Sequence, residues 1–190
     1  MITTIFDNVR LSYASESASP LDGSSQPQKG TDVSRQMSQL MTAANLGALL
    51  SPLSKAVTVG GVTWATKGSV IKNGIIRVDT AISALTPCRL RMTVNELKPS
   101  EPTLQYLIGD GRWGFSARRL CLNTPHRPFP GTHKHRSEPG GGDEKAYEPD
   151  DIPFAPLQPR VAPGTYRAIL EAFAAECFIA IGDDFIWREP

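Results

Sequence analysis

The stretch CRLRMTVNEL, residues 88–97, alternates apolar and polar side chains along its length. A period of two is typical of a β-strand that has one buried face and one polar face. Here it places Leu90 and Met92 on one face, and Arg89 and Arg91 on the other. The stretch therefore predicts a sheet with an apolar face and a basic face.

Runs of the same kind extend this predicted sheet over residues 57–136. Five β-branched or alternating runs are separated by Gly, Pro, Asn-Gly and Asp-Gly, a spacing typical of an antiparallel meander. The clearest hairpin signals are Asn73-Gly74 and Asp110-Gly111. We therefore expect a meander of strands joined by short turns.

Two amphipathic helices are predicted outside the sheet. Residues 33–50 carry Met and Leu side chains at helical spacing, and residues 165–180 carry a second apolar stripe. We expect both helices to pack on the apolar face of the sheet, which makes the fold α+β. The Ser- and Pro-rich residues 14–31 are expected to form a flexible segment, because they offer a core few apolar side chains.

These elements suggest a division of the chain into two parts. Residues 1–56 are expected to contain a short strand, the flexible segment and the first helix. Residues 57–190 are expected to form the α+β domain with its central sheet and C-terminal helix. A chain of 190 residues has room for one core of ordinary size and some additional length.

The charges are distributed unevenly, although the net charge is only +1. Residues 88–136 hold nine basic and three acidic side chains, whereas residues 137–190 hold four basic and eleven acidic ones. A basic block suits a phosphate-bearing partner, and an acidic segment could pair with that block inside the fold. The charge pattern thus favours a nucleic-acid or phosphate ligand without naming one.

The three cysteines show no CxxC or CxC spacing, which indicates neither a disulfide framework nor a thiolate zinc site. A reducing cytoplasm is therefore the expected location. No stretch approaches the ~18 apolar residues that a membrane span requires, so no membrane partner is expected.

All three histidines, His126, His133 and His135, lie within ten consecutive residues at the end of the basic block. If residues 132–136 are extended, His133 and His135 point to the same side of the strand. This cluster is the candidate functional site. The cluster could form a phosphodiester-binding site or a metal site, or it could be a surface loop with no catalytic or binding role.

The leading interpretation is a protein that binds RNA or another phosphodiester. It could also cleave its ligand as a metal-independent, toxin-like ribonuclease, and no cofactor is expected. Such an enzyme uses one group as a base, a second as an acid, and cations to stabilise the charge on phosphorus. The expected catalytic residues are His126, His133 and His135, with Tyr147 as an auxiliary group. The side chains expected to bind nucleic acid are Arg89, Arg91, Arg118, Arg119, Arg127, Lys134 and Arg136.

Two alternatives remain open. His133, His135 and Glu138 form H-x-H-x-x-E, a ligand set that suits Fe(II), Zn, Mn or Ni. This spacing resembles part of the first cupin motif, with two residues rather than three or four before the Glu, and it implies a metal-binding β-barrel protein. The other alternative is a non-catalytic interaction protein, antitoxin-like or phage-encoded, that docks on a protein partner through the helix at 33–50.

Residues 89–180 contain RRLCLN, GTHKH, AYEPDDIP and YRAILEAFAAECFI in this order. The arrangement resembles a loosely defined group of small uncharacterised bacterial proteins with a G-x-H-x-H turn, an aromatic-x-P-x-D-I-P segment and a terminal helix. This resemblance implies an association with toxin–antitoxin or mobile-element loci and with phage defence. It assigns no catalytic residue.

Overall fold

The computed structural model describes residues 36, 38–109, 115–125, 127–140, 142–147 and 161–190. The flexible segment predicted at 14–31, the Asp110-Gly111 turn and His126 lie outside these described residues.

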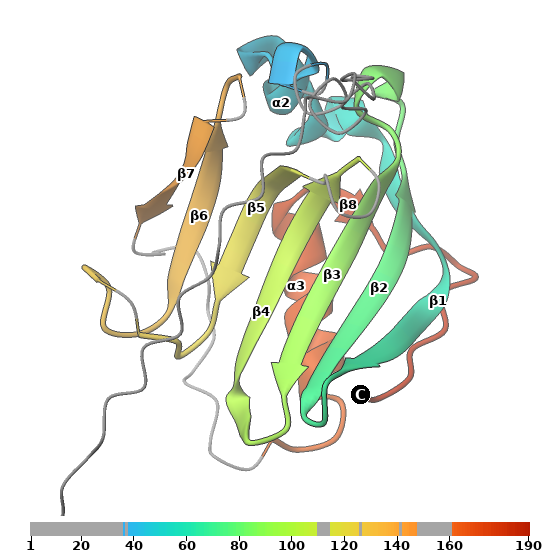
Figure 1. The fold of residues 1–190 in the computed structure, drawn as a ribbon. Helices are drawn as coiled ribbons and strands as arrows, with labels where there is room; N and C mark the ends of the chain where they lie inside the picture. Colours follow the sequence, from blue (N-terminus) through green and yellow to red (C-terminus); the bar gives the residue numbers. More distant parts are fainter. Residues whose placement is uncertain (1–35, 37, 110–114, 126, 141, 148–160) are drawn as a thin grey trace, which may run out of the picture.

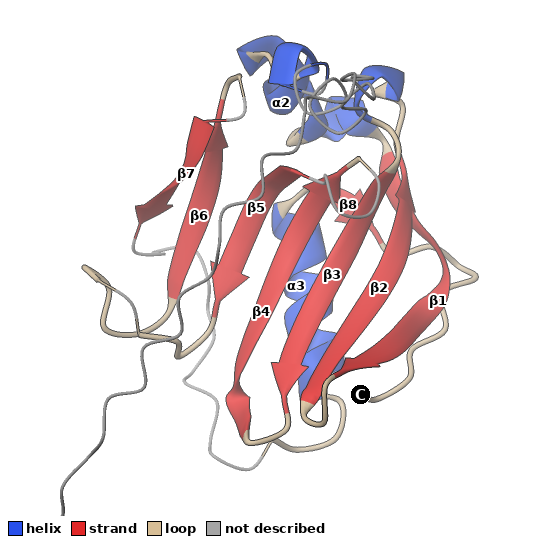
Figure 2. Cartoon of the chain, in the orientation of Figure 1, coloured by secondary structure: helices blue, strands red, loops and turns tan. Residues whose placement is uncertain are grey.

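The described residues form one eight-stranded sheet with the order β7-β6-β5-β4-β3-β2-β1-β8 (Figures 1 and 2). Neighbours from β1 to β7 pair antiparallel, and β8 pairs parallel with β1 at the far edge. The predicted antiparallel sheet is confirmed, and with its helices the fold is α+β. The strands are β1 (Ala56–Lys67), β2 (Ile71–Asp79), β3 (Cys88–Asn95), β4 (Lys98–Ile108), β5 (Phe115–Cys121), β6 (His133–Glu138), β7 (Gly142–Tyr147) and β8 (Ile179–Ala180).

The alternation predicted for residues 88–97 is confirmed in β3. Every second side chain, from Cys88 to Val94, is buried, while the arginines between them are only partly covered. The buried side chains join one core with those of β4, among them Leu104 and Tyr106. The apolar period of two thus decides which face of the sheet is covered.

Helix α3 (Thr165–Glu176) covers that apolar face, behind the central strands in Figure 1. Its Ile169, Leu170 and Phe173 are almost completely buried. The helix ends earlier than the prediction of 165–180, because Phe178 adopts a left-handed backbone conformation with φ 58°. The next two residues form β8, whose pairing with β1 replaces the expected last helical turn.

The prediction of one continuous helix over residues 33–50 is wrong. Residues 38–40 are helical, but the helix stops at Met41, and a new helix, α2 (Ala43–Leu49), begins after Thr42. The Thr42 hydroxyl accepts a hydrogen bond from the backbone N–H of Asn45 at 3.1 Å, which caps this new helix. Two short 3-10 helices, η1 (Pro52–Ser54) and η2 (Ser83–Leu85), complete the helical elements of the described chain.

Helix α2 lies at one end of the sheet rather than across its apolar face (Figure 2). Its Leu46 and Leu49 are buried in the common core, and so is the preceding Met41. Within the described residues, the Met and Leu side chains that suggested a docking helix therefore pack mostly inside the molecule. No described helix is long and apolar enough to cross a membrane.

The hairpin predicted at Asn73-Gly74 is also wrong, because both residues lie inside β2. Gly74 is opposite Trp64 on one side and Met92 on the other. A Cβ atom at position 74 would lie 2.8 Å from two atoms of the Trp64 ring. This glycine thus makes space for an aromatic side chain, and the β1–β2 turn falls at residues 68–70 instead.

Candidate functional site

A row of polar side chains crosses four neighbouring strands on the side of the sheet turned away from α3. Arg91 of β3 is opposite Gln105 of β4, Gln105 is opposite Arg119 of β5, and Arg119 is opposite His135 of β6. We call this side of the sheet, defined by these four residues and Arg89, the polar face. The basic face predicted from the alternation of β3 therefore extends across the sheet.

Hydrogen bonds join this row in two pairs. The Arg91 Nε donates to Gln105 Oε1 at 2.9 Å, and the Nη2 of the same guanidinium donates to the same oxygen. The Arg119 Nη2 lies 2.8 Å from Nε2 and 3.0 Å from Nδ1 of His135. A guanidinium can only donate, so His135 must offer it an unprotonated ring nitrogen.

Three arginine side chains lie close together on the polar face. The pKa of Arg91 is lowered, first because the side chain is partly withdrawn from water and then because Arg89 and Arg119 lie close by. These like charges repel one another, and a bound anion would reduce the repulsion. The three arginines are thus arranged in a way that suits a negatively charged ligand.

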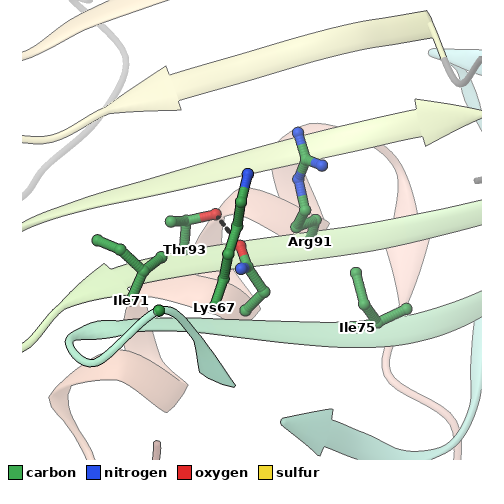
Figure 3. A pocket seen from close by; sticks show the side chains of 7 residues that line it. Lys67, Ile71, Ile75, Arg91 and Thr93 are labelled. Atoms are coloured by element: carbon green, nitrogen blue, oxygen red, sulfur yellow. Dashed lines mark hydrogen bonds between the residues drawn. The ribbon is translucent and has the colours of Figure 1, made fainter. Parts of the chain in front are cut away.

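A pocket of about 670 Å³ adjoins Arg91 at the β1–β3 end of the polar face. Figure 3 shows Lys67 rising from the end of β1 beside Thr93, with Arg91 farther along β3. The Thr93 hydroxyl donates to the side-chain oxygen of Asn73 at 2.9 Å. Cationic and hydrogen-bonding groups thus stand together beside apolar walls made by Ile71 and Ile75.

His133 and His135 lie on the polar face, at the β6 end of the row, and both are buried with exposed fractions of 0% and 3%. Their rings meet edge to face with centroids 4.9 Å apart, and Phe129 stacks on His133 at 5.6 Å. The Nδ1 of His133 donates to the backbone oxygen of Gly131 at 2.9 Å. The prediction that the two imidazoles share one face is consistent with this placement, but they are not in an accessible hollow.

Cys121 completes a cluster that the sequence did not reveal. It lies directly opposite His133 in the β5–β6 pair, and its Sγ and one ring nitrogen of each of His133 and His135 all lie within 4.8 Å of one another. The spacing of the cysteines along the sequence indicated no thiolate metal site. The position of Cys121 beside the histidines depends on the register between two strands that an eleven-residue connection separates, and the sequence does not give that register. The expected third ligand, Glu138, is not in this cluster.

Several of the predicted nucleic-acid-binding residues lie on the other side of the sheet, because side chains alternate along a strand. Lys134 is 1% exposed, and its ammonium lies 2.5 Å from the carboxylate of Glu176 in α3. Arg118 is opposite Tyr106, a core residue on the α3 side. These two cations therefore cannot share a binding surface with Arg91 and Arg119.

The remaining predicted site residues are also separated from the histidines. Tyr147 is opposite Lys134, and the Arg136 guanidinium lies 4.8 Å from the centre of the Tyr147 ring. Tyr147 and Arg136 thus belong to the α3 side of β6 and β7, so Tyr147 is badly placed to assist His133. Arg127 is exposed in the β5–β6 connection, where it lines a small pocket with Phe129.

No family model, curated protein sequence or solved structure matches the chain. The resemblance of residues 89–180 to small bacterial proteins therefore stays a hypothesis.

Proposed function

We propose that the polar face binds RNA through its phosphodiester backbone. The observation that carries this proposal is that Arg89, Arg91 and Arg119 converge on one side of the sheet. Burial lowers the pKa of Arg91 most, and the nearby charges of Arg89 and Arg119 lower it further. Guanidinium groups form paired hydrogen bonds with phosphate oxygens. A phosphate placed among these three arginines would offset their mutual repulsion.

The extent of the basic surface favours a polymer over a single small anion. Lys67 lies on β1 and Arg119 on β5, four strand spacings apart in the sheet. Neighbouring strands are ~4.8 Å apart, so these cations lie roughly 19 Å apart in the direction across the strands. Successive phosphates of one extended chain could contact both ends of such a surface.

The histidine geometry favours binding over cleavage by His133 and His135. An acid and a base must each come within about 2.6–3.2 Å of oxygens on opposite sides of the phosphorus. The rings of His133 and His135 touch each other, with centroids 4.9 Å apart. They leave no room for a phosphate between them, and the proposed role of this protein is therefore to bind RNA.

Fluorescence anisotropy with labelled single-stranded RNA in EDTA tests the proposal. We expect affinity to fall linearly with the logarithm of salt concentration, with a slope of about −0.7 for each phosphate contacted. Arg91→Gln should weaken binding and reduce this slope by about 0.7.

Arg167→Gln is the matched control, since Arg167 lies on α3 and pairs with Glu171 on the other side of the molecule. It should leave RNA binding unchanged. The proposal fails if the wild type does not bind RNA at low salt, or if the two variants bind it equally well.

A further inference from the structure

We propose that Cys121, His133 and His135 form a transition-metal site whose preferred occupant is Zn(II). One thiolate and two imidazoles are a ligand set that Zn(II) favours, and three protein ligands leave a fourth coordination position. This inference goes beyond the proposed RNA binding, and it rests on a different group of side chains. It also departs from the expectation that the protein needs no cofactor.

The spacing of the three ligand atoms fits a metal ion after small side-chain adjustments. They lie within 4.8 Å of one another. Metal–sulfur and metal–nitrogen bonds of about 2.3 and 2.0–2.1 Å require ligand atoms to be ~3.3–3.6 Å apart around a tetrahedral ion. Closing a difference of at most about 1.5 Å calls for side-chain rotations rather than a change in the register of β5 and β6.

The hydrogen bond of His133 also prepares it to bind a metal. The Gly131 carbonyl can only accept, so the proton of neutral His133 lies on Nδ1. The lone pair is then on Nε2. Metal-binding histidines commonly donate a hydrogen bond from the N–H of their second ring nitrogen to a backbone oxygen in this way, and the contact fixes both the tautomer and the ring orientation.

The strand pairing also holds the three ligands in fixed positions. His133 and His135 are alternate residues of one strand, and Cys121 is the cross-strand partner of His133. All three side chains are buried, and Phe129 covers the His133 ring. Ligands on paired strands are held more precisely than ligands on loops, which lowers the cost of organising the site.

Arg119 is the element that opposes metal binding. Its guanidinium donates to a ring nitrogen of His135. If His135 used one nitrogen for the metal, the other would carry a proton and could no longer accept from Arg119. Metal binding must therefore release Arg119 from His135, and the negative thiolate of Cys121 offsets part of the repulsion between the metal and the guanidinium.

Cobalt titration of the full chain, purified with a chelator and free of RNA, tests this site. We expect one Co(II) per chain, a thiolate-to-cobalt charge-transfer band in the near ultraviolet, and displacement of Co(II) by one equivalent of Zn(II). Cys121→Ser should abolish the band and weaken Zn(II) binding by about tenfold or more.

Cys88→Ser is the matched control, because Cys88 is also buried but lies on the apolar side of the sheet. Its thiol donates to the backbone oxygen of Leu85, a contact that a serine hydroxyl can keep. This variant should show the wild-type cobalt spectrum.

Arg119→Gln supplies a test that does not require loss of a ligand. The glutamine oxygen could accept the second ring N–H of His135, and a cation next to the metal would be removed. We expect this variant to bind Zn(II) about tenfold more tightly.

Two results would overturn the site: no stoichiometric Co(II) or Zn(II) binding by the wild type and Arg119→Gln, or an unchanged charge-transfer band in Cys121→Ser. Because these titrations contain no RNA and the RNA experiments contain EDTA, either proposal can fail alone.

Discussion

Gly74 illustrates how a residue type is chosen by its neighbour rather than by its backbone. Asn-Gly is a strong hairpin signal in a sequence, yet this glycine lies inside β2 under the ring of Trp64. Sequence reasoning gives the preference of the dipeptide, but not the position of an aromatic ring ten residues away.

Replacing Gly74 by alanine should therefore destabilise the protein. The new methyl group would lie 2.8 Å from the Trp64 ring, which would have to move within a packed region. We expect a loss of about 1–3 kcal/mol in the free energy of unfolding, measured by urea denaturation. Gly47→Ala in α2 is the control, because a Cβ there meets nothing within 4 Å. It should be neutral or stabilising, and equal losses in both variants would contradict the explanation.

Lys134 and Glu176 form an ion pair whose two members differ in exposure. The Lys134 side chain is 1% exposed, whereas that of Glu176 is 21% exposed. Removing the carboxylate leaves a deeply buried ammonium without this partner, but removing the ammonium leaves a carboxylate that reaches water.

Glu176→Gln should thus be the more damaging change, with a loss of about 3–5 kcal/mol in the free energy of unfolding. Lys134→Met preserves the volume of the buried stem and should cost clearly less. Chemical denaturation of the two variants measures the difference. A larger loss of stability for Lys134→Met would show that the cost of burying an ammonium without this carboxylate is not the main effect.

At the scale of elements, strands were easier to predict than helices. The alternation of β3 depends on side chains within eight residues, and it is reproduced in the burial of every second residue. The helix predicted over 33–50 depended on an apolar stripe that continues from Met41 to Leu46, on both sides of Thr42. The backbone breaks there because Thr42 caps a new helix, and a stripe of apolar residues does not reveal such a change in direction.

The cap at Thr42 should make a measurable contribution to stability. Thr42→Ala removes the oxygen that accepts from the Asn45 N–H and should lower the free energy of unfolding by about 1 kcal/mol. Thr42→Ser keeps this oxygen and should recover most of the loss. Thermal unfolding followed by circular dichroism distinguishes the three proteins. If serine is no better than alanine, the hydroxyl does not stabilise α2.

For the whole molecule, the limit of sequence reasoning is register. The sequence places His133 and His135 on one side of their strand, but it does not state which residue of β5 lies opposite them. The pairing of Cys121 with His133 brings a thiol into the cluster, and alternation sends Lys134 toward α3. The charges of residues 88–136 are therefore divided between two faces, although the sequence presents them as one basic block.

Arg119 belongs to both proposed sites and should couple them. Its guanidinium is held by His135, so an RNA phosphate and a metal ion would each favour the state in which this contact is broken. Two ligands that favour the same state strengthen each other's binding by the same factor. Saturating Zn(II) should therefore increase the affinity of the wild type for RNA by about fivefold, measured by anisotropy at fixed salt. Cys121→Ser should lose this increase and keep the RNA affinity measured in EDTA. Equal RNA affinity of the zinc-bound and metal-free wild type would mean that Arg119 does not link the two ends of the polar face.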